Sequence, residues 1–76
     1  MHNMDKKELL PSLLIGKKIK EIRKSKGITQ EKLAVRSNVA YTTFTKIENG
    51  TIKNPSFKTI VAIAKELDVN FNELIK

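Results

Sequence analysis

Two short helical stretches joined by a tight corner occupy residues 29–50, and no other feature restricts the fold as strongly. Thr29 can cap the first stretch, because its hydroxyl can accept a backbone N–H that the helix leaves unpaired. Asn38 then makes the corner, since asparagine is one of the few non-glycine residues that enter the left-handed region at low cost. A second helix of about Tyr41 to Asn49 follows, and Gly50 ends it.

The rest of the sequence shows no strand-like alternation, so we expect an all-α chain of five helices. The first helix should open at Pro11–Ser12, with Ser12 as its cap, and stop at Lys26–Gly27. Its buried stripe consists of Ile15, Ile19 and Ile22. Residues 1–11 match no motif and are expected to form a flexible leader, which leaves residues 12–76 as one folded domain.

Two further helices complete the predicted chain. The fourth should start near Phe57 behind a Ser56 cap. Asn70 and Glu73 have the spacing of a capping box and should open the last helix, so that the corner before it is Val69–Asn70. The inward positions of the fourth helix are expected to be Phe57, Ile60, Ile63, Ala64 and Leu67.

Composition excludes several classes of chemistry. The chain has no cysteine, and its one histidine, His2, lies in the expected leader. We therefore expect no disulfide, no metal site and no cofactor. Paired acids and a glycine-rich phosphate loop are also missing, so the chain has no candidate catalytic residues and no evident small-molecule substrate. No apolar run reaches the length of a membrane span, which predicts a soluble, cytoplasmic protein with no membrane partner.

The net charge of +7 suits a polyanionic partner, because Lys and Arg that neutralise phosphates release condensed counterions. Residues 1–26 carry eight basic residues against three acids, residues 27–54 four against two, and residues 55–76 three against three. The basic excess thus precedes residue 55. A solvated lysine-rich surface would show the same charge.

Several motifs at these intervals resemble the lambda-repressor-like helix-turn-helix family, also called the Cro or xenobiotic-response-element type. They are the run from Ile19 to Ala34, the Ile47–Gly50 ending and the Asn54–Pro55–Ser56 step, and the likeness covers about residues 14–74. The resemblance implies a compact five-helix domain whose second and third helices form the motif. It also implies that the third helix, here the recognition helix, lies in the major groove of double-stranded DNA.

Positions that read base edges in this family correspond here to exposed residues of the recognition helix. Lysine can reach guanine, threonine can donate or accept, and alanine can pack on a thymine methyl. An ordinary solvated helix face would carry similar residues. The base-reading candidates are Ala40, Tyr41, Thr42 and Lys46, with Thr45 as a further one.

Phosphate contacts are implied at two places. Gln30 matches a phosphate-binding position at the start of the second helix, although it could also be a simple helix-start residue. The loop after the recognition helix supplies the others, which are Asn49, Lys53, Asn54 and Ser56.

Two further positions carry structural expectations. Arg23 and Glu48 occupy the places of a partly buried ion pair in related repressors. Ala40 stands where the family usually has a Ser or Thr cap, so the start of the recognition helix departs from the pattern.

One small domain presents one recognition helix, so we expect a homodimer on a palindromic operator. The dimer interface is expected at the C-terminal end of the sequence, where apolar residues would otherwise close the core of a single copy. The function implied is that of a sequence-specific transcriptional regulator, and not an enzyme. An antitoxin that binds a toxin partner and its own promoter, or a restriction-modification controller protein, remains an alternative. The expected dimer interface is formed by Leu67, Val69, Phe71, Leu74 and Ile75.

Overall fold

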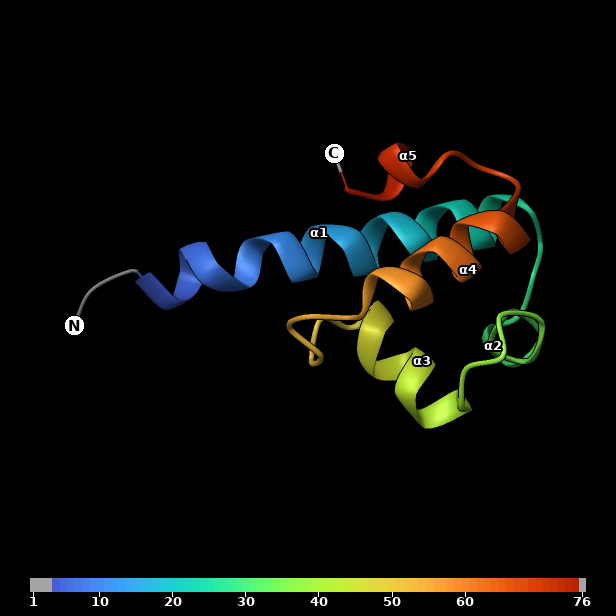
Figure 1. Ribbon diagram of the computed structural model, residues 1–76, viewed down its shortest axis with the longest axis horizontal. Coiled ribbons are helices and arrows are strands. Elements are labelled where there is room, and N and C mark those ends of the chain that lie inside the picture. Colours follow the sequence, from blue (N-terminus) through green and yellow to red (C-terminus); the bar gives the residue numbers. More distant parts are fainter. Residues whose placement is uncertain (1–3, 76) are drawn as a thin grey trace.

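The computed structural model describes the backbone of residues 4–75 and the side chains of residues 14–75, and this part of the chain is helical without strands. Figure 1 shows α1 along the length of the molecule, with α3 on one side of it and α5 on the other. Within the described residues, no helix is long and apolar enough to span a membrane. The expected all-α class with five helices is confirmed. The helices are α1 (Met4–Ser25), α2 (Gln30–Arg36), α3 (Tyr41–Glu48), α4 (Phe57–Leu67) and α5 (Phe71–Ile75).

The start of α1 differs from the expected one. The helix begins at Met4 and continues through Pro11, so Ser12 is not its cap. Lysine, glutamate and leucine, which are strong helix formers, occupy residues 6–10 and favour a helix on that side of the proline. Residues 1–3 lie outside the described residues, and the assignment of residues 1–11 as a flexible leader stays a prediction.

Four helices are followed by a residue with left-handed backbone; Gly50 follows α3 with a φ angle of 81°, and the other three helices share one hydrogen-bond pattern. Gly27, Asn38 and Asp68 follow α1, α2 and α4 with φ angles of 69°, 59° and 58°. Gly27 and Asn38 are the corners that the sequence predicts, whereas the last corner begins one residue earlier than expected. After each, an apolar residue packs against the core and donates its N–H to the carbonyl five residues back, as in a Schellman motif. These bonds run from Ile28 to Arg23, from Val39 to Ala34 and from Val69 to Ala64.

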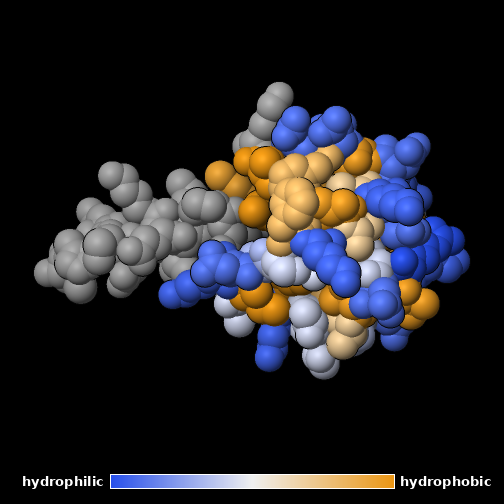
Figure 2. All heavy atoms as spheres, in the orientation of Figure 1, coloured by the Kyte–Doolittle hydropathy of each residue, from blue (hydrophilic) through white to orange (hydrophobic). Residues whose placement is uncertain are grey.

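One side chain expected in the interior lies at the surface instead. Phe57 is 69% exposed. Its position in α4 is on the side expected to face the core, but a side chain is buried there only where another helix covers it. Its ring meets that of Phe71 edge to face, with centroids 4.8 Å apart. Val61, four residues after Phe57, and Ile75, four after Phe71, extend this surface. We call these four residues the α4–α5 patch, and Figure 2 shows apolar side chains gathered over these two helices.

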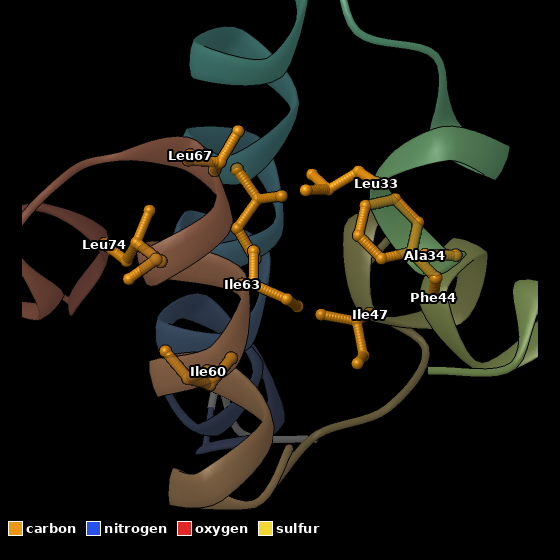
Figure 3. Close-up of a cluster of buried hydrophobic side chains, with 10 residues drawn as sticks. Leu33, Ala34, Phe44, Ile47, Ile60, Ile63, Leu67 and Leu74 are labelled. Atoms are coloured by element: carbon orange, nitrogen blue, oxygen red, sulfur yellow. The ribbon is translucent and has the colours of Figure 1, made fainter. Parts of the chain in front are cut away.

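The core draws on all five helices (Figure 3). Leu67 and Leu74 belong to it and are 0% and 1% exposed, so they offer no surface to a second copy. This corrects their assignment to a dimer interface: α5 folds back onto α1 and α4, and Leu74 closes the core of the single chain. The ten buried apolar residues are Ile19, Leu33, Ala34, Phe44, Ile47, Ile60, Ile63, Ala64, Leu67 and Leu74.

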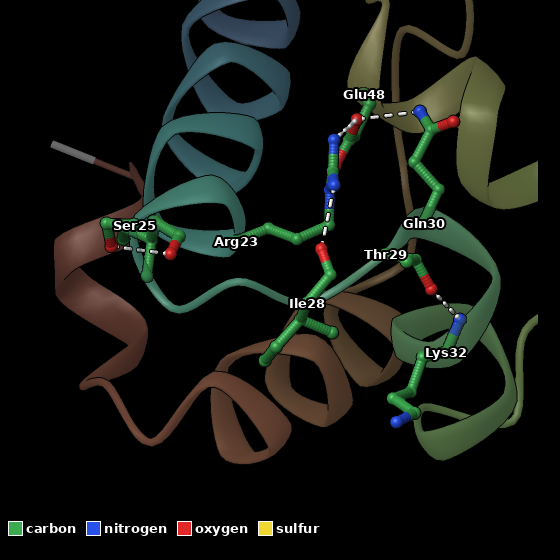
Figure 4. A network of polar contacts seen from close by, with 8 residues as sticks. Arg23, Ser25, Ile28, Thr29, Gln30, Lys32 and Glu48 are labelled. Carbon is green, nitrogen blue, oxygen red and sulfur yellow. Dashed lines mark hydrogen bonds and ion pairs between the residues drawn. The ribbon is translucent and has the colours of Figure 1, made fainter.

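A buried ion pair joins α1 to the end of α3 (Figure 4). Arg23 Nε donates to Glu48 Oε2 at 2.6 Å, and a second guanidinium nitrogen donates to Oε1 at 3.2 Å. The third nitrogen donates to the carbonyl of Ile28 at 2.8 Å, and Gln30 Nε2 donates to Glu48 Oε1 at 2.9 Å. The expected pair is therefore present, and it also fixes the turn after α1 and the start of α2.

Burial makes this pair important for stability. The side chains of Arg23 and Glu48 are only 9% and 3% exposed. Removing one partner of such a pair leaves the other charge without compensation and costs about 3–5 kcal/mol. Domains of this size have a free energy of unfolding of roughly 4–11 kcal/mol in total. Loss of this pair would therefore remove a large share of the stability of the fold.

We predict that Glu48→Ala lowers the free energy of unfolding by about 3–5 kcal/mol. Glu48→Gln should also destabilise, because one amide oxygen cannot accept the three hydrogen bonds that the carboxylate receives. Chemical denaturation measures both changes. Glu21→Ala, at an exposed position of α1, serves as the control and should change stability by less than about 0.5 kcal/mol. A Glu48→Ala protein as stable as the control would contradict the structural role.

Candidate nucleic-acid interface

The recognition helix α3 has two chemically different sides. Phe44, Ile47 and Glu48 are buried and hold it to the body. Thr42 and Lys46, four residues apart, lie on the opposite side and are exposed. Two more of the five base-reading candidates, Ala40 and Tyr41, are exposed at the start of the helix. One short helix thus separates its attachment to the core from a surface that can meet a ligand.

Thr45, the fifth candidate, lies differently. It is half-buried, and its hydroxyl donates to the carbonyl of Thr42 at 2.9 Å. It also lines a hollow at the side of the helix. Thr45 thus lies beside the hollow, whereas the other four candidates are exposed to solvent.

The first turn of α3 has no side-chain cap. Ala40 has the extended backbone of a cap residue, with φ −58° and ψ 141°, but makes no side-chain hydrogen bond. The first turn also contains no acidic residue. Its backbone N–H groups, at the positive end of the helix dipole, therefore remain accessible to an acceptor outside the helix.

A hollow of about 170 Å³ lies where three helices meet. Lys20 comes from α1, Gln30 from α2, and Thr45, Glu48 and Asn49 from the end of α3. Gln30 uses one amide N–H on Glu48 and keeps a second N–H and its oxygen. An ammonium group and amide donors together suit an anion such as a phosphate.

Lys20 was not among the residues predicted for this site, although it lines the hollow. Its spacing could have revealed it, because it follows Gly16 by four residues and precedes Arg23 by three. Positions at these spacings share one side of a helix. Since Arg23 was expected to face α3, the same spacing predicts that Lys20 also faces α3.

The loop between α3 and α4 contains the remaining predicted phosphate contacts. Asn49 Oδ1 accepts the N–H of Thr51 at 2.9 Å, which leaves its amide N–H groups as donors. Lys53 and Asn54 are exposed. Ser56 is the cap of α4: it accepts the N–H of Thr59 at 3.1 Å and donates its own proton to Thr59 Oγ1 at 2.8 Å. In this arrangement the hydroxyl of Ser56 has no proton left for a phosphate.

Among the residues that the structure describes, no three His, Asp or Glu side chains come together as a metal site. The carboxylate that lines the hollow, Glu48, is paired with Arg23, so the Lys20 ammonium and the amide donors are the groups that can meet an anion there.

Comparison with known proteins identifies the family. The sequence profile described as "Helix-turn-helix" matches residues 19–74. Among curated relatives, the Bacillus subtilis regulators SlrR and SinR are 38% and 34% identical to this chain, over 61 and 62 residues. These alignments cover 80% and 82% of the chain but only 40% and 56% of the two relatives. The chain therefore spans about half the length of these relatives.

Two solved structures share the fold, each with a TM-score of 0.78. One is the restriction-modification controller protein C.AhdI from Aeromonas hydrophila, 32% identical, for which the match covers 82% of this chain and 92% of that chain. The other is the biofilm regulator SinR in complex with DNA, 34% identical, with 82% and 98% covered. Profile, relatives and structures agree with the resemblance read from the sequence, and the chain belongs to the lambda-repressor-like helix-turn-helix family of DNA-binding transcriptional regulators.

Proposed function

We propose that the chain is a sequence-specific regulator that places α3 in the major groove of double-stranded DNA and acts by occupying an operator, without catalysis. The observation that carries this proposal is the division of α3 into a buried side and an exposed side. Thr42 and Lys46 on the exposed side, with the exposed Tyr41 in the first turn, offer donors, acceptors and a methyl group to base edges. The likeness to SinR, which was solved in complex with DNA, supports DNA as the partner.

Phosphate contacts would fix the register of α3 in the groove. Lys20 and Gln30 flank α3 on one side, and Lys53 and Asn54 follow it in the loop. Contacts of this kind add affinity without sequence information, whereas the exposed side of α3 supplies the choice of bases. The net charge of +7 supports the contribution of phosphate contacts to affinity.

The regulator acts in the cytoplasm as a homodimer that covers the α4–α5 patch. Phe57, Val61 and Ile75 are 69%, 37% and 47% exposed, which is unusual for large apolar residues side by side. Residues 57–75 carry two basic residues against three acids, so two copies can approach here without the repulsion that the basic surfaces would cause. The interface is thus centred on Phe57 and Phe71 rather than on the buried Leu67 and Leu74.

Geometry also supports this dimer. α5 and α3 lie on opposite sides of α1 (Figure 1), so contact through the patch leaves the recognition helix exposed. A two-fold dimer places its two recognition helices about 34 Å apart and requires a palindromic operator. Stable interfaces bury roughly 1,200–2,000 Å² in total, so the four patch residues form its centre and their neighbours its rim.

A controller protein of a restriction-modification system is the second candidate. The likeness to C.AhdI favours it, because the match covers 92% of that protein. The DNA-binding surface and the dimer would be the same, and only the regulated genes would differ. Binding of a toxin partner stays a prediction.

We predict that selection from a random DNA pool enriches one palindromic motif. Lys46→Ala should cost about 1–3 kcal/mol of binding free energy at its own base position and relax the preference there. Lys20→Ala removes the same type of side chain from the hollow, and it should weaken binding to all sequences equally and reduce the salt dependence. The absence of any enriched motif with the wild-type chain would refute the proposed function.

A pair of substitutions at Ala40 tests which end of α3 meets DNA. Ala40→Ser and Ala40→Asp both supply the missing cap and should raise the free energy of unfolding by about 1 kcal/mol. Only the aspartate adds a negative charge, so only Ala40→Asp should weaken binding to a non-specific duplex. Thermal melts and fluorescence anisotropy measure the two effects. If both variants bind DNA as the wild type does, the start of α3 does not approach the phosphates.

Phe57→Lys tests the dimer. The side chain is exposed, so the variant should fold normally but sediment as a monomer at concentrations where the wild type is dimeric. Val35→Lys, which places the same charge at an exposed apolar position of α2, is the matched control and should remain dimeric. A wild-type chain that is monomeric at high micromolar concentration, with and without operator DNA, would rule out the homodimer.

A further inference from the structure

Gly16 lies at the contact between α1 and the end of the recognition helix, and it is buried. A Cβ atom at this position would come within 2.5 Å of the carbonyl oxygen of Ile47 and 2.8 Å of the carbonyl carbon of Glu48. It would come closer still to the carbonyl oxygen of Glu48. All three are backbone atoms, so no change of side-chain rotamer can make room for a methyl group.

Backbone conformation does not explain this glycine. Gly27 and Gly50 have positive φ angles, which favour glycine, whereas Gly16 lies within α1 without one. A glycine in the interior of a helix costs about 1 kcal/mol relative to alanine. The close approach of α3 is therefore the feature of the structure that requires Gly16.

Gly16 and Arg23 hold the same part of α3 from two places on α1. They are seven residues apart, which corresponds to about two turns on one side of a helix, or roughly 10 Å along its axis. Gly16 meets the backbone of Glu48, and Arg23 binds its side chain. Two such contacts determine both the distance of α3 from α1 and its tilt.

We propose that Gly16 is a positioning residue for DNA recognition, an inference that rests on the proposed function. It sets how far the base-reading side of α3 stands from the phosphate-binding groups Lys20 and Gln30. Atoms in contact normally lie about 3.5–4 Å apart, so a methyl group at residue 16 forces α3 away by on the order of 1 Å. Hydrogen bonds to bases tolerate only a few tenths of an ångström, whereas long lysine side chains can adjust to phosphates.

The test compares Gly16→Ala with the wild type on two duplexes of equal length, one carrying the selected motif and one scrambled. We expect binding to the motif to weaken about tenfold, the effect of one or two lost base contacts, and binding to the scrambled duplex to change less than about twofold. Leu74→Val is the matched control, because it loosens the core at α5, which packs mainly on α1 and α4. It should keep the wild-type ratio of the two affinities. A wild-type ratio in a folded Gly16→Ala protein would overturn the proposal.

A second measurement keeps the inference testable if Gly16→Ala does not fold or if the wild type shows no sequence preference. A crystal structure of the wild-type chain should place the Gly16 Cα within about 4 Å of the carbonyl oxygens of Ile47 and Glu48. A gap there wide enough for a methyl group would overturn the proposal. Failure of the proposed function alone would instead appear as this close contact in a protein without sequence preference.

Discussion

The ion pair between Arg23 and Glu48 is the interaction on which the arrangement of this domain depends. Its guanidinium and carboxylate are joined by two hydrogen bonds, and neighbouring groups from the turn after α1 and from α2 complete their hydrogen bonding. Four parts of the chain therefore meet at one charged centre. Any other placement of α3 would leave one of these charges buried without its partner, which is far more costly than a change in apolar packing.

This anchor explains how so short a helix can hold a fixed position in the domain, as the proposed function requires. The eight residues of α3 would not form a stable helix alone in water, and the first turn lacks a cap. Phe44 and Ile47 contribute apolar burial, and Glu48 adds a directional contact at the far end. Because stability comes from the buried side, the exposed side can differ among related proteins without loss of the fold. In the proposed function, the chemistry that chooses DNA sequence is thus separated from the chemistry that holds the helix.

The predictable parts of the fold are those that depend on local backbone chemistry. Gly27 and Asn38 were expected at corners because few residue types tolerate positive φ, and the structure places both there. The caps Thr29 and Ser56 were expected for a similar reason, since their hydroxyls accept backbone N–H groups. The predicted start of α1 at Pro11–Ser12 was wrong, because the helix continues through the proline instead of opening at it. The pairing of Arg23 with Glu48 came from the family resemblance and not from any local pattern.

The sequence by itself determined the five helices, the corners at Gly27 and Asn38 and the polar face of α3, because each is encoded within a few consecutive residues, and the spacing of its motifs determined the family. Only the tertiary structure decided which residues from distant segments meet. It brought Lys20 and Gln30 together beside α3, buried Leu74, left Phe57 exposed and pressed Gly16 against the end of α3. Periodicity shows that a residue faces one side of its helix, but burial depends on whether another element covers that side. That covering is a property of the packed chain.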